Sequence, residues 1–192
     1  MNSKNRKAIF LDRDGVINDL VDRGSNFSVR GKVVRWTTPF SHKEFFLKPG
    51  IDRVLEEMGQ NGFLRVLATN QPDIAYGLLS REEHDRIMSD VKNLPLDDVF
   101  ICIHGRDDGC GCKKPKPGML MDASEKWGIN LEKSYMIGDH ENDILAGKSA
   151  GCKTILISQS YHGGDPVPDF VASNLDVAWN FIQEAEKYEN IY

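Results

Sequence analysis

Two aspartates near the amino terminus, Asp12 and Asp14, are separated by one residue, so an extended chain directs both carboxylates roughly the same way. Carboxylates this close repel each other unless a cation lies between them or one of them holds a proton. Asp139 would bring a third carboxylate from a distant part of the chain, with Asp143 one helical turn later. Oxygen ligands of this kind favour a hard divalent cation, most commonly Mg²⁺ in phosphate chemistry. Asp143 either joins this site or caps the helix that begins near Asn142.

Two further residues would complete a site for an anion. Lys114 adds a fixed positive charge, and Thr69 adds a hydroxyl with backbone donors beside it. Carboxylates, a divalent cation, a lysine and a hydroxyl together form a receptor for a dianionic phosphate. The cation and the lysine would screen the phosphate charge, so that a carboxylate could approach the phosphorus.

Three of the four cysteines and a histidine lie within eleven residues, in the order Cys102, His104, Cys110 and Cys112. Three sulfurs and an imidazole are a donor set that suits tetrahedral Zn²⁺. Because four protein ligands leave no open position for water, we expect a structural zinc site in the loop 102–112. This zinc would hold Lys113 and Lys114 beside the carboxylates.

The alternative to zinc is a packing role for part of this cluster. Cys102 would then be a core residue at the end of a strand, and His104 a residue of a turn. Packing does not account for Cys110 and Cys112, which lie in a glycine-rich loop, and this favours zinc. Cys152 stands apart from the cluster and is expected to be a small buried residue.

Composition narrows the class of protein. The 192 residues suffice for one domain over 1–192 that buries roughly 70% of the surface its unfolded chain exposes. A net charge of -5 argues against binding nucleic acid or an anionic membrane through bulk charge. The chain lacks an apolar run of membrane-spanning length and a signal-peptide pattern at its start. We therefore expect a cytoplasmic protein, in which clustered cysteines bind metal and do not form disulfides.

Short apolar runs alternate with helical patterns along nearly the whole chain. Strands are expected at 8–11, 64–69, 99–104, 135–138 and 153–158, and helices at about 51–62, 80–92, 117–128, 142–151 and 176–187. The helix at 80–92 would open with a capping box of Ser80 and Glu83. The pattern predicts an α/β fold with a parallel sheet, helices on both faces and ligands at the carboxyl ends of the strands. Asp12, Thr69 and Asp139 all follow strands at that edge.

The segment 19–48 interrupts the alternation. Its stretch FSVRGKVVRW has apolar residues on both sides of Arg30-Gly31-Lys32, which predicts a β-hairpin inserted after the first strand. The basic residues of this segment either line the entrance to the site or lie on a solvated surface. They are Arg23, Arg30, Lys32 and Arg35.

Four short runs, DRDGVIN, TNQ, KKPKPGM and GDHEND, resemble in this order the four motifs of the haloacid dehalogenase superfamily of phosphohydrolases. The resemblance extends from Ile9 to about Ile157. It implies a Rossmann-like sheet without a large cap domain, and Asp12 as a nucleophile that forms an aspartyl-phosphate. Asp14 would be the general acid and base.

The same resemblance assigns the remaining parts of the site. Mg²⁺ would be held by Asp12, Asp139 and the backbone carbonyl of Asp14. Thr69 and Lys114 would stabilise the transferring phosphoryl group. Lys114 is preferred over its neighbour two residues later because the pattern KPxPGM begins at Lys114.

The cysteine pairs before KPxPGM narrow the resemblance to the zinc-containing branch with heptose 1,7-bisphosphate and histidinol-phosphate phosphatases. Three features depart from this branch: a shorter loop between the pairs, Lys113 where the heptose enzymes usually have arginine, and the larger insertion at 19–48. Arginine can bind an anion through two parallel donors, whereas lysine is a point charge. The resemblance implies substrate contacts, which we expect at Arg13, Asn18, Asp19, Asn70, Gln71, Lys113 and His140.

The expected function is that of a Mg²⁺-dependent phosphatase, acting as a monomer on a phosphorylated sugar such as D-glycero-D-manno-heptose 1,7-bisphosphate. One alternative is histidinol phosphate, whose cationic amine needs an acidic pocket. Another is a catalytically silent, zinc-stabilised binding module, which the intact Asp12 and Asp14 oppose.

Overall fold

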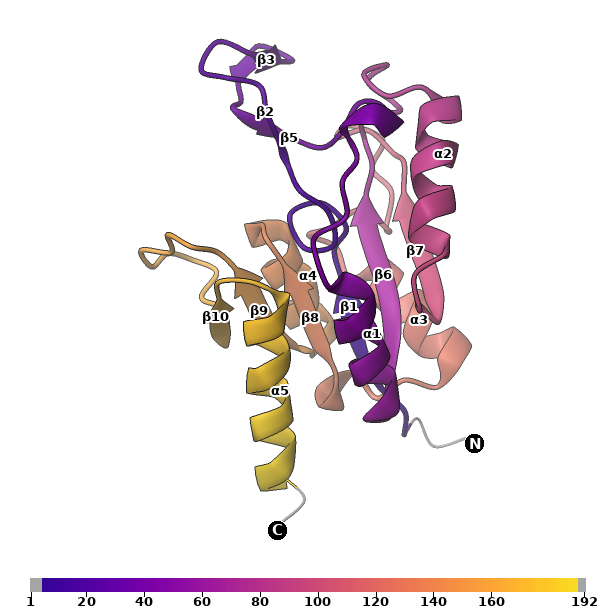
Figure 1. The fold of residues 1–192 in the computed structure, drawn as a ribbon, viewed down its shortest axis with the longest axis vertical. Helices are drawn as coiled ribbons and strands as arrows, with labels where there is room; N and C mark the ends of the chain where they lie inside the picture. Colours follow the sequence, from indigo (N-terminus) through magenta and orange to yellow (C-terminus); the bar gives the residue numbers. More distant parts are fainter. Residues whose placement is uncertain (1–4, 190–192) are drawn as a thin grey trace.

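The computed structural model describes residues 5–189 and contains a sheet of six parallel strands. The strand order is β10-β9-β8-β1-β6-β7 (Figure 1). This confirms the predicted α/β class and five of the strands, and adds β10, whose three residues carry too short a pattern to predict. The bounds are β1 (Lys7–Leu11), β6 (Phe63–Asn70), β7 (Asp98–Cys102), β8 (Tyr135–Gly138), β9 (Lys153–Ile157) and β10 (Phe170–Ala172).

Five α-helices cover the two faces of the sheet, and alternate residues of β1 show how. Ile9 and Leu11 pack in one core cluster with residues of α1, α2 and α5, while Ala8 and Phe10 pack in another with residues of α3. All four side chains are fully buried. The helices are α1 (Ile51–Gln60), α2 (Arg81–Lys92), α3 (Gly118–Trp127), α4 (Glu141–Ala150) and α5 (Leu175–Glu189), with short 3-10 helices at His42–Glu44 and Leu131–Lys133. None of these helices, within residues 5–189, has the length and apolarity needed to cross a membrane.

The predicted capping box of α2 is only half formed. The Ser80 hydroxyl accepts a hydrogen bond from the Glu83 backbone N–H at 3.1 Å. The Glu83 carboxylate does not return to Ser80 but accepts from the backbone N–H of His42 at 2.6 Å. The start of α2 is thereby tied to the segment that follows the insertion, a long-range contact that a local sequence pattern cannot show.

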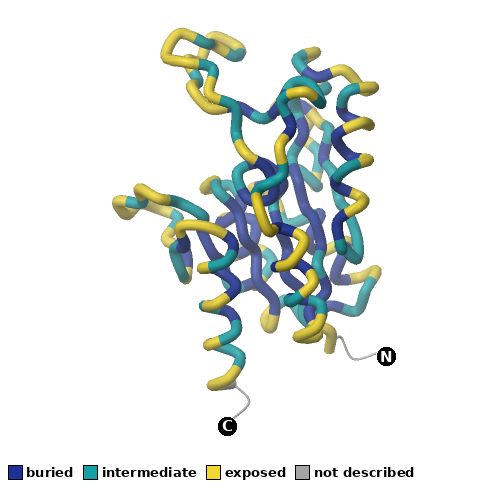
Figure 2. The backbone as a smooth tube through the Cα atoms, in the orientation of Figure 1, coloured by how far each residue is buried: buried dark blue, intermediate teal, exposed yellow. Residues whose placement is uncertain are grey.

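The insertion after β1 is a hairpin with two short antiparallel ladders. β2 (Val21–Asp22) pairs with β5 (Trp36–Thr37) at its base, and β3 (Ser28–Val29) pairs with β4 (Lys32–Val33) at its tip. It projects beyond the carboxyl ends of the sheet strands (Figure 1), and most of its backbone is exposed (Figure 2). The predicted hairpin is confirmed, and no large cap is present among the described residues.

Candidate active site

Three carboxylates gather at the carboxyl edge of the sheet. Asp12 follows β1, Asp139 follows the adjacent strand β8, and Asp143 lies in the first turn of α4. One carboxylate oxygen from each lies within 4.8 Å of the others. The backbone N–H of Asp12 donates to the carbonyl of Ile137 at 2.9 Å, which continues the pairing of β1 with β8. Adjacent parallel strands therefore bring together residues far apart in sequence.

The carboxylates of this cluster disfavour one another's ionisation. Burial raises the pKa of Asp12 to about 6, even though Lys114 lowers it, and Asp143 and Asp14 raise it further. Burial also raises the pKa of Asp139 to about 8, with further contributions from the charges of Asp12, Asp143 and Asp14. Oxygen donors that are crowded in this way, and hard to ionise together, suit a divalent cation such as Mg²⁺.

Lys114 is buried beside these carboxylates. Its Nζ lies 3.0 Å from Asp12 Oδ1 and 2.5 Å from Asp143 Oδ1, and donates to the carbonyl of Ala68 at 2.7 Å. Burial alone would lower the pKa of Lys114, but the charges of Asp12 and Asp143 outweigh it and raise the pKa. The lysine is therefore a fixed positive charge.

Asn70 holds the backbone of Lys114 on both sides. Its Nδ2 donates to the Lys114 carbonyl and its Oδ1 accepts from the Lys114 N–H, both at 3.0 Å. We expected Asn70 to contact substrate. The amide lines the cleft but spends both ends on Lys114, so its place in the structure is that of a residue that positions the lysine.

Of the two roles that the sequence left open for Asp143, the structure shows the helix cap, and it also places the carboxylate in the cluster with Asp12 and Asp139. Its Oδ2 accepts from the backbone N–H of His140 at 3.1 Å and caps α4, while Oδ1 contacts Lys114. Gly138 makes this approach possible, because a Cβ at position 138 would lie 2.2 Å from the Cβ of Asp143.

The Asp14 side chain turns toward a buried polar network and is not part of the three-carboxylate cluster. It accepts from Arg13 Nη2 at 3.0 Å, Asn18 Nδ2 at 3.0 Å and Gln71 Nε2 at 2.8 Å. Arg13, Asn18 and Gln71 are fully buried. These three side chains therefore orient Asp14, which itself lines the cleft, and their expected contacts with substrate stay a prediction.

The remaining residues that we expected in the site differ in whether they line the cleft. Thr69 is fully buried, and its hydroxyl accepts from Gln71 Nε2 at 2.9 Å. Asp19 is exposed, pairs with Lys48 and lies outside the cleft that holds Asp12. His140 and Lys113 do line that cleft.

The cleft above the carboxylates has a volume of about 430 Å³. The hairpin contributes three apolar residues to the lining, Val29, Val34 and Trp36, here called the apolar wall. Tyr76, Arg106 and Lys113 also line the cleft and are here called the cationic wall. Sequence patterns did not single out Tyr76, Arg106 or Trp36, since each lies in a turn or hairpin where nothing local marks a cleft. Trp36 was in principle detectable as an apolar residue at an alternate position of the hairpin.

The basic residues of the hairpin do not line the cleft. Three of them pair with acidic side chains: Arg23 with Glu44 at 2.6 Å, Arg30 with Asp107 at 3.0 Å, and Arg35 with Asp22 at 2.8 Å. Lys32 is exposed. The hairpin therefore contributes no basic side chain to the lining of this cleft.

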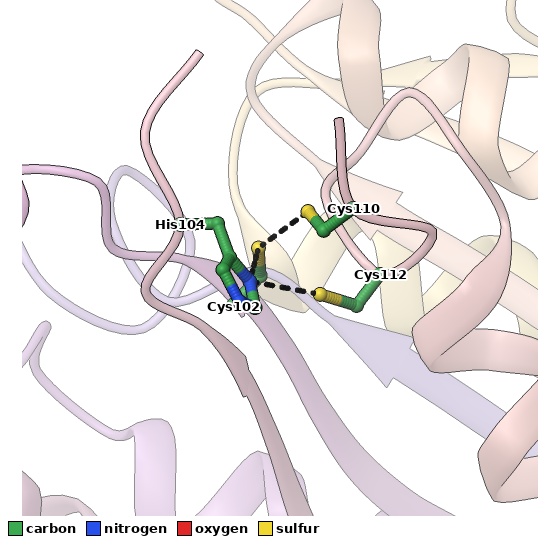
Figure 3. A group of neighbouring side chains, drawn as sticks. All are labelled: Cys102, His104, Cys110 and Cys112. Atoms are coloured by element: carbon green, nitrogen blue, oxygen red, sulfur yellow. Dashed lines mark hydrogen bonds between the residues drawn. The ribbon is translucent and has the colours of Figure 1, made fainter. Parts of the chain in front are cut away.

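The Cys102, His104, Cys110 and Cys112 side chains converge at the end of β7 (Figure 3). Cys102 Sγ lies 3.7 Å from Cys110 Sγ and 3.5 Å from His104 Nδ1, and Cys112 Sγ lies 3.3 Å from the same nitrogen. A Zn–S bond of about 2.3 Å implies a tetrahedral S–S edge of roughly 3.8 Å, so the spacing fits Zn²⁺. Cys152 is buried in the core cluster that contains Phe10, as expected.

Replacing Gly15 by alanine should disrupt the carboxylate cluster. A Cβ at position 15 would lie 2.1 Å from Asp139 Oδ2, and the φ of +78° adds backbone strain. We expect kcat/KM to fall roughly 100-fold, the scale of an ångström displacement at a reacting centre. Gly62→Ala is the control, since its φ of +84° is similar but nothing lies within 4 Å of the added Cβ. Equal activity of the two variants would contradict this.

The effect of Mg²⁺ on thermal stability should grow with pH. The pKa of Asp139 is raised from 3.8 to about 8. Between about pH 4 and pH 8, the folded metal-free protein therefore binds more protons than the unfolded chain. Its stability falls as the pH rises through this range. Mg²⁺ binds the ionised carboxylates and should restore this loss. Melting curves with and without Mg²⁺ should diverge as pH increases, and the divergence should vanish in Asp139→Asn. A Mg²⁺ effect that is the same at every pH would refute the account.

A parallel sheet that gathers three carboxylates and a buried lysine at its carboxyl edge defines the class: an enzyme of phosphoryl transfer. A family profile described as haloacid dehalogenase-like hydrolase matches residues 25–157. The chain belongs to the haloacid dehalogenase-like hydrolases and is a phosphatase of this type.

Individual relatives are similar over most of their length. The D-glycero-beta-D-manno-heptose-1,7-bisphosphate 7-phosphatase of Helicobacter pylori (strain J99) is 36% identical over 159 residues, 79% of this chain and 82% of the relative. The D-glycero-alpha-D-manno-heptose-1,7-bisphosphate 7-phosphatase of Campylobacter jejuni is 29% identical over 187 residues, 94% and 98% of the two chains. The crystal structure of D,D-heptose 1,7-bisphosphate phosphatase from B. bronchiseptica with magnesium and phosphate has a TM-score of 0.73 and 30% identity, and the match covers 93% of this chain and 99% of that one. The branch that the cysteine pairs indicated is thereby confirmed.

Proposed function

We propose that the chain removes the 7-phosphate from D-glycero-D-manno-heptose 1,7-bisphosphate, with Mg²⁺ as the cofactor. The relatives described above carry the names of enzymes with this substrate. The observation that carries the proposal is a pair of cations: Arg106 and Lys113 line the same cleft as the Asp12 cluster. The carboxylate end would bind the transferred phosphate, and these two cations the distal phosphate.

In this reaction Asp12 attacks the phosphorus, and the bond between phosphorus and the sugar oxygen breaks. Asp14 donates a proton to the departing oxygen, and afterwards removes one from the water that attacks the aspartyl-phosphate and releases Asp12. The bonds of Asp12 Oδ1 with the backbone N–H of Arg13, at 2.8 Å, and with Lys114 Nζ orient the nucleophile. Bound Mg²⁺, held by Asp12, Asp139 and the carbonyl of Asp14, would neutralise phosphate charge.

Arg13 and two amides hold the Asp14 side chain in place for this proton transfer. Lys114 stays charged throughout and stabilises the phosphoryl group.

We further propose that the cysteine and histidine cluster binds one structural Zn²⁺. The loop it would fix runs directly into Lys113 and Lys114. Lys113 Nζ donates to the carbonyl of the ligand His104 at 3.1 Å. A fixed loop would therefore hold both lysines in the lining of the cleft.

A panel of phosphate esters tests the substrate. We expect kcat/KM for the bisphosphate to exceed that for heptose 7-phosphate by roughly 10- to 100-fold, the value of charge-assisted hydrogen bonds to the distal phosphate. Arg106→Gln and Lys113→Gln should erase this difference without changing the rate for the monophosphate. Both anomers of the bisphosphate belong in the panel, because relatives of both names match. A preference for histidinol phosphate would contradict the proposal.

A further inference from the structure

The tip of the hairpin is fastened to the cysteine loop. Arg30 Nη2 donates to Asp107 Oδ2 at 3.0 Å. The guanidinium carbon of Arg30 also lies 4.9 Å from the ring centroid of Tyr76, within cation–π range. These three residues, here called the clasp, come from the hairpin, the cysteine loop and the turn after β6, and they meet beside the cleft.

The backbone conformation at the hairpin tip indicates that the side chain of Arg30 has a role. Arg30 has a φ of +50° and Gly31 a φ of +78°, so both central residues of the turn between β3 and β4 are left-handed. Turns of this kind favour Asn-Gly, and Arg30 is the only residue other than glycine with a positive φ among the described residues. An arginine in such an unfavourable backbone conformation indicates that the contacts of its side chain have a role.

The neighbours of the clasp form both walls of the cleft. Val29 precedes Arg30 and lines the apolar wall. Arg106 precedes Asp107 and lines the cationic wall, and its backbone N–H donates to the Tyr76 hydroxyl at 2.8 Å. A closed clasp therefore fixes the two walls relative to each other, whereas the carboxylate cluster has its own supports in β1, β8 and α4.

We propose that Arg30 and Asp107 are positioning residues that close the hairpin over the substrate and hold Arg106 against the phosphate that is not transferred. This inference rests on the proposed function for the identity of that phosphate. The clasp residues act through Val29 and Arg106 and do not touch the reacting atoms.

The exposure of the clasp makes it reversible. The side chains of Arg30 and Asp107 are 49% and 75% exposed, so water screens their attraction and the ion pair is weak. The stacking on Tyr76 adds a contribution of similar size. A latch of this strength can close on bound substrate and open for product release.

Steady-state kinetics of Arg30→Asn test the role in binding. Asparagine is preferred at this turn position, so the hairpin should form at least as well. We expect KM for the bisphosphate to rise roughly fivefold to tenfold, with kcat unchanged. The KM for p-nitrophenyl phosphate, which lacks a distal phosphate, should stay the same. Arg30→Lys should recover part of the loss, and Lys32→Gln, which removes a charge at the same tip, should have no effect.

Limited trypsin digestion of the whole enzyme tests closure without any substrate. Asp107→Asn keeps every basic residue of the hairpin but breaks the ion pair, so cleavage after Lys32 and Arg35 should become faster than in the wild type. Cleavage at the wild-type rate, or an unchanged KM in Arg30→Asn, would overturn the proposal. If the wild type does not prefer the bisphosphate, the substrate assignment fails, and the digestion alone then decides whether the clasp exists.

Discussion

Asp12→Asn should abolish turnover while the fold remains intact. The amide cannot form the aspartyl-phosphate, and loss of a nucleophile costs roughly 10⁴-fold or more in kcat. The variant should melt at the wild-type temperature or above in the absence of metal. Burial and neighbouring carboxylates disfavour the Asp12 charge, as its raised pKa of about 6 shows, and Lys114 keeps Asp143 as a partner.

Asp122→Asn on α3 is the matched control, because the same chemical change falls on an exposed residue outside the cleft. It should leave both kcat and melting temperature unchanged. Wild-type activity in Asp12→Asn would rule out covalent catalysis by this residue. A large loss of melting temperature in that variant would contradict the electrostatic account of the cluster.

Loss of the cysteine cluster should have the largest effect on stability. We expect one zinc per chain by elemental analysis, and Cys112→Ser should lose the metal. Structural zinc sites contribute many kcal/mol to folding, so the melting temperature should fall by roughly 10 °C or more. Activity toward a simple ester should fall as well, because the loop leads directly to Lys114.

Cys152→Ala controls for the removal of a thiol. Cys152 is buried in the second core cluster, away from the cleft, so this variant should keep its zinc and its activity. Metal-free protein that melts and turns over like the wild type would remove the case for structural zinc.

Local pattern was sufficient to predict most of the fold. Helix α3 begins after Pro117 and ends before Gly128, which has a φ of 65°, as its flanking residues indicated. Asp12, Asp139 and Lys114 meet because each follows a strand of one parallel sheet, and the order of strands and helices already implied that edge.

Contacts between distant segments could not be predicted from local sequence patterns. DRDG suggested that the side chains of Asp12 and Asp14 would point the same way, yet the Asp14 side chain pairs with Gln71, which is 57 residues away. Arg30 was assigned either to the entrance or to solvent, whereas its partner Asp107 lies 77 residues further along the chain. Both cases depend on where a loop closes in space, and no local periodicity encodes that.

The central claim is that Asp12 is the phosphoryl acceptor in a divalent-cation site completed by a carboxylate from β8. A crystal structure with Mg²⁺ and beryllium fluoride, which mimics an acyl-phosphate, tests it most directly. The account predicts beryllium bonded to a carboxylate oxygen of Asp12, Mg²⁺ in contact with Asp12 and Asp139, and Lys114 in contact with a fluoride. Beryllium fluoride bound away from Asp12, or Asp139 turned away from the cation, would contradict it.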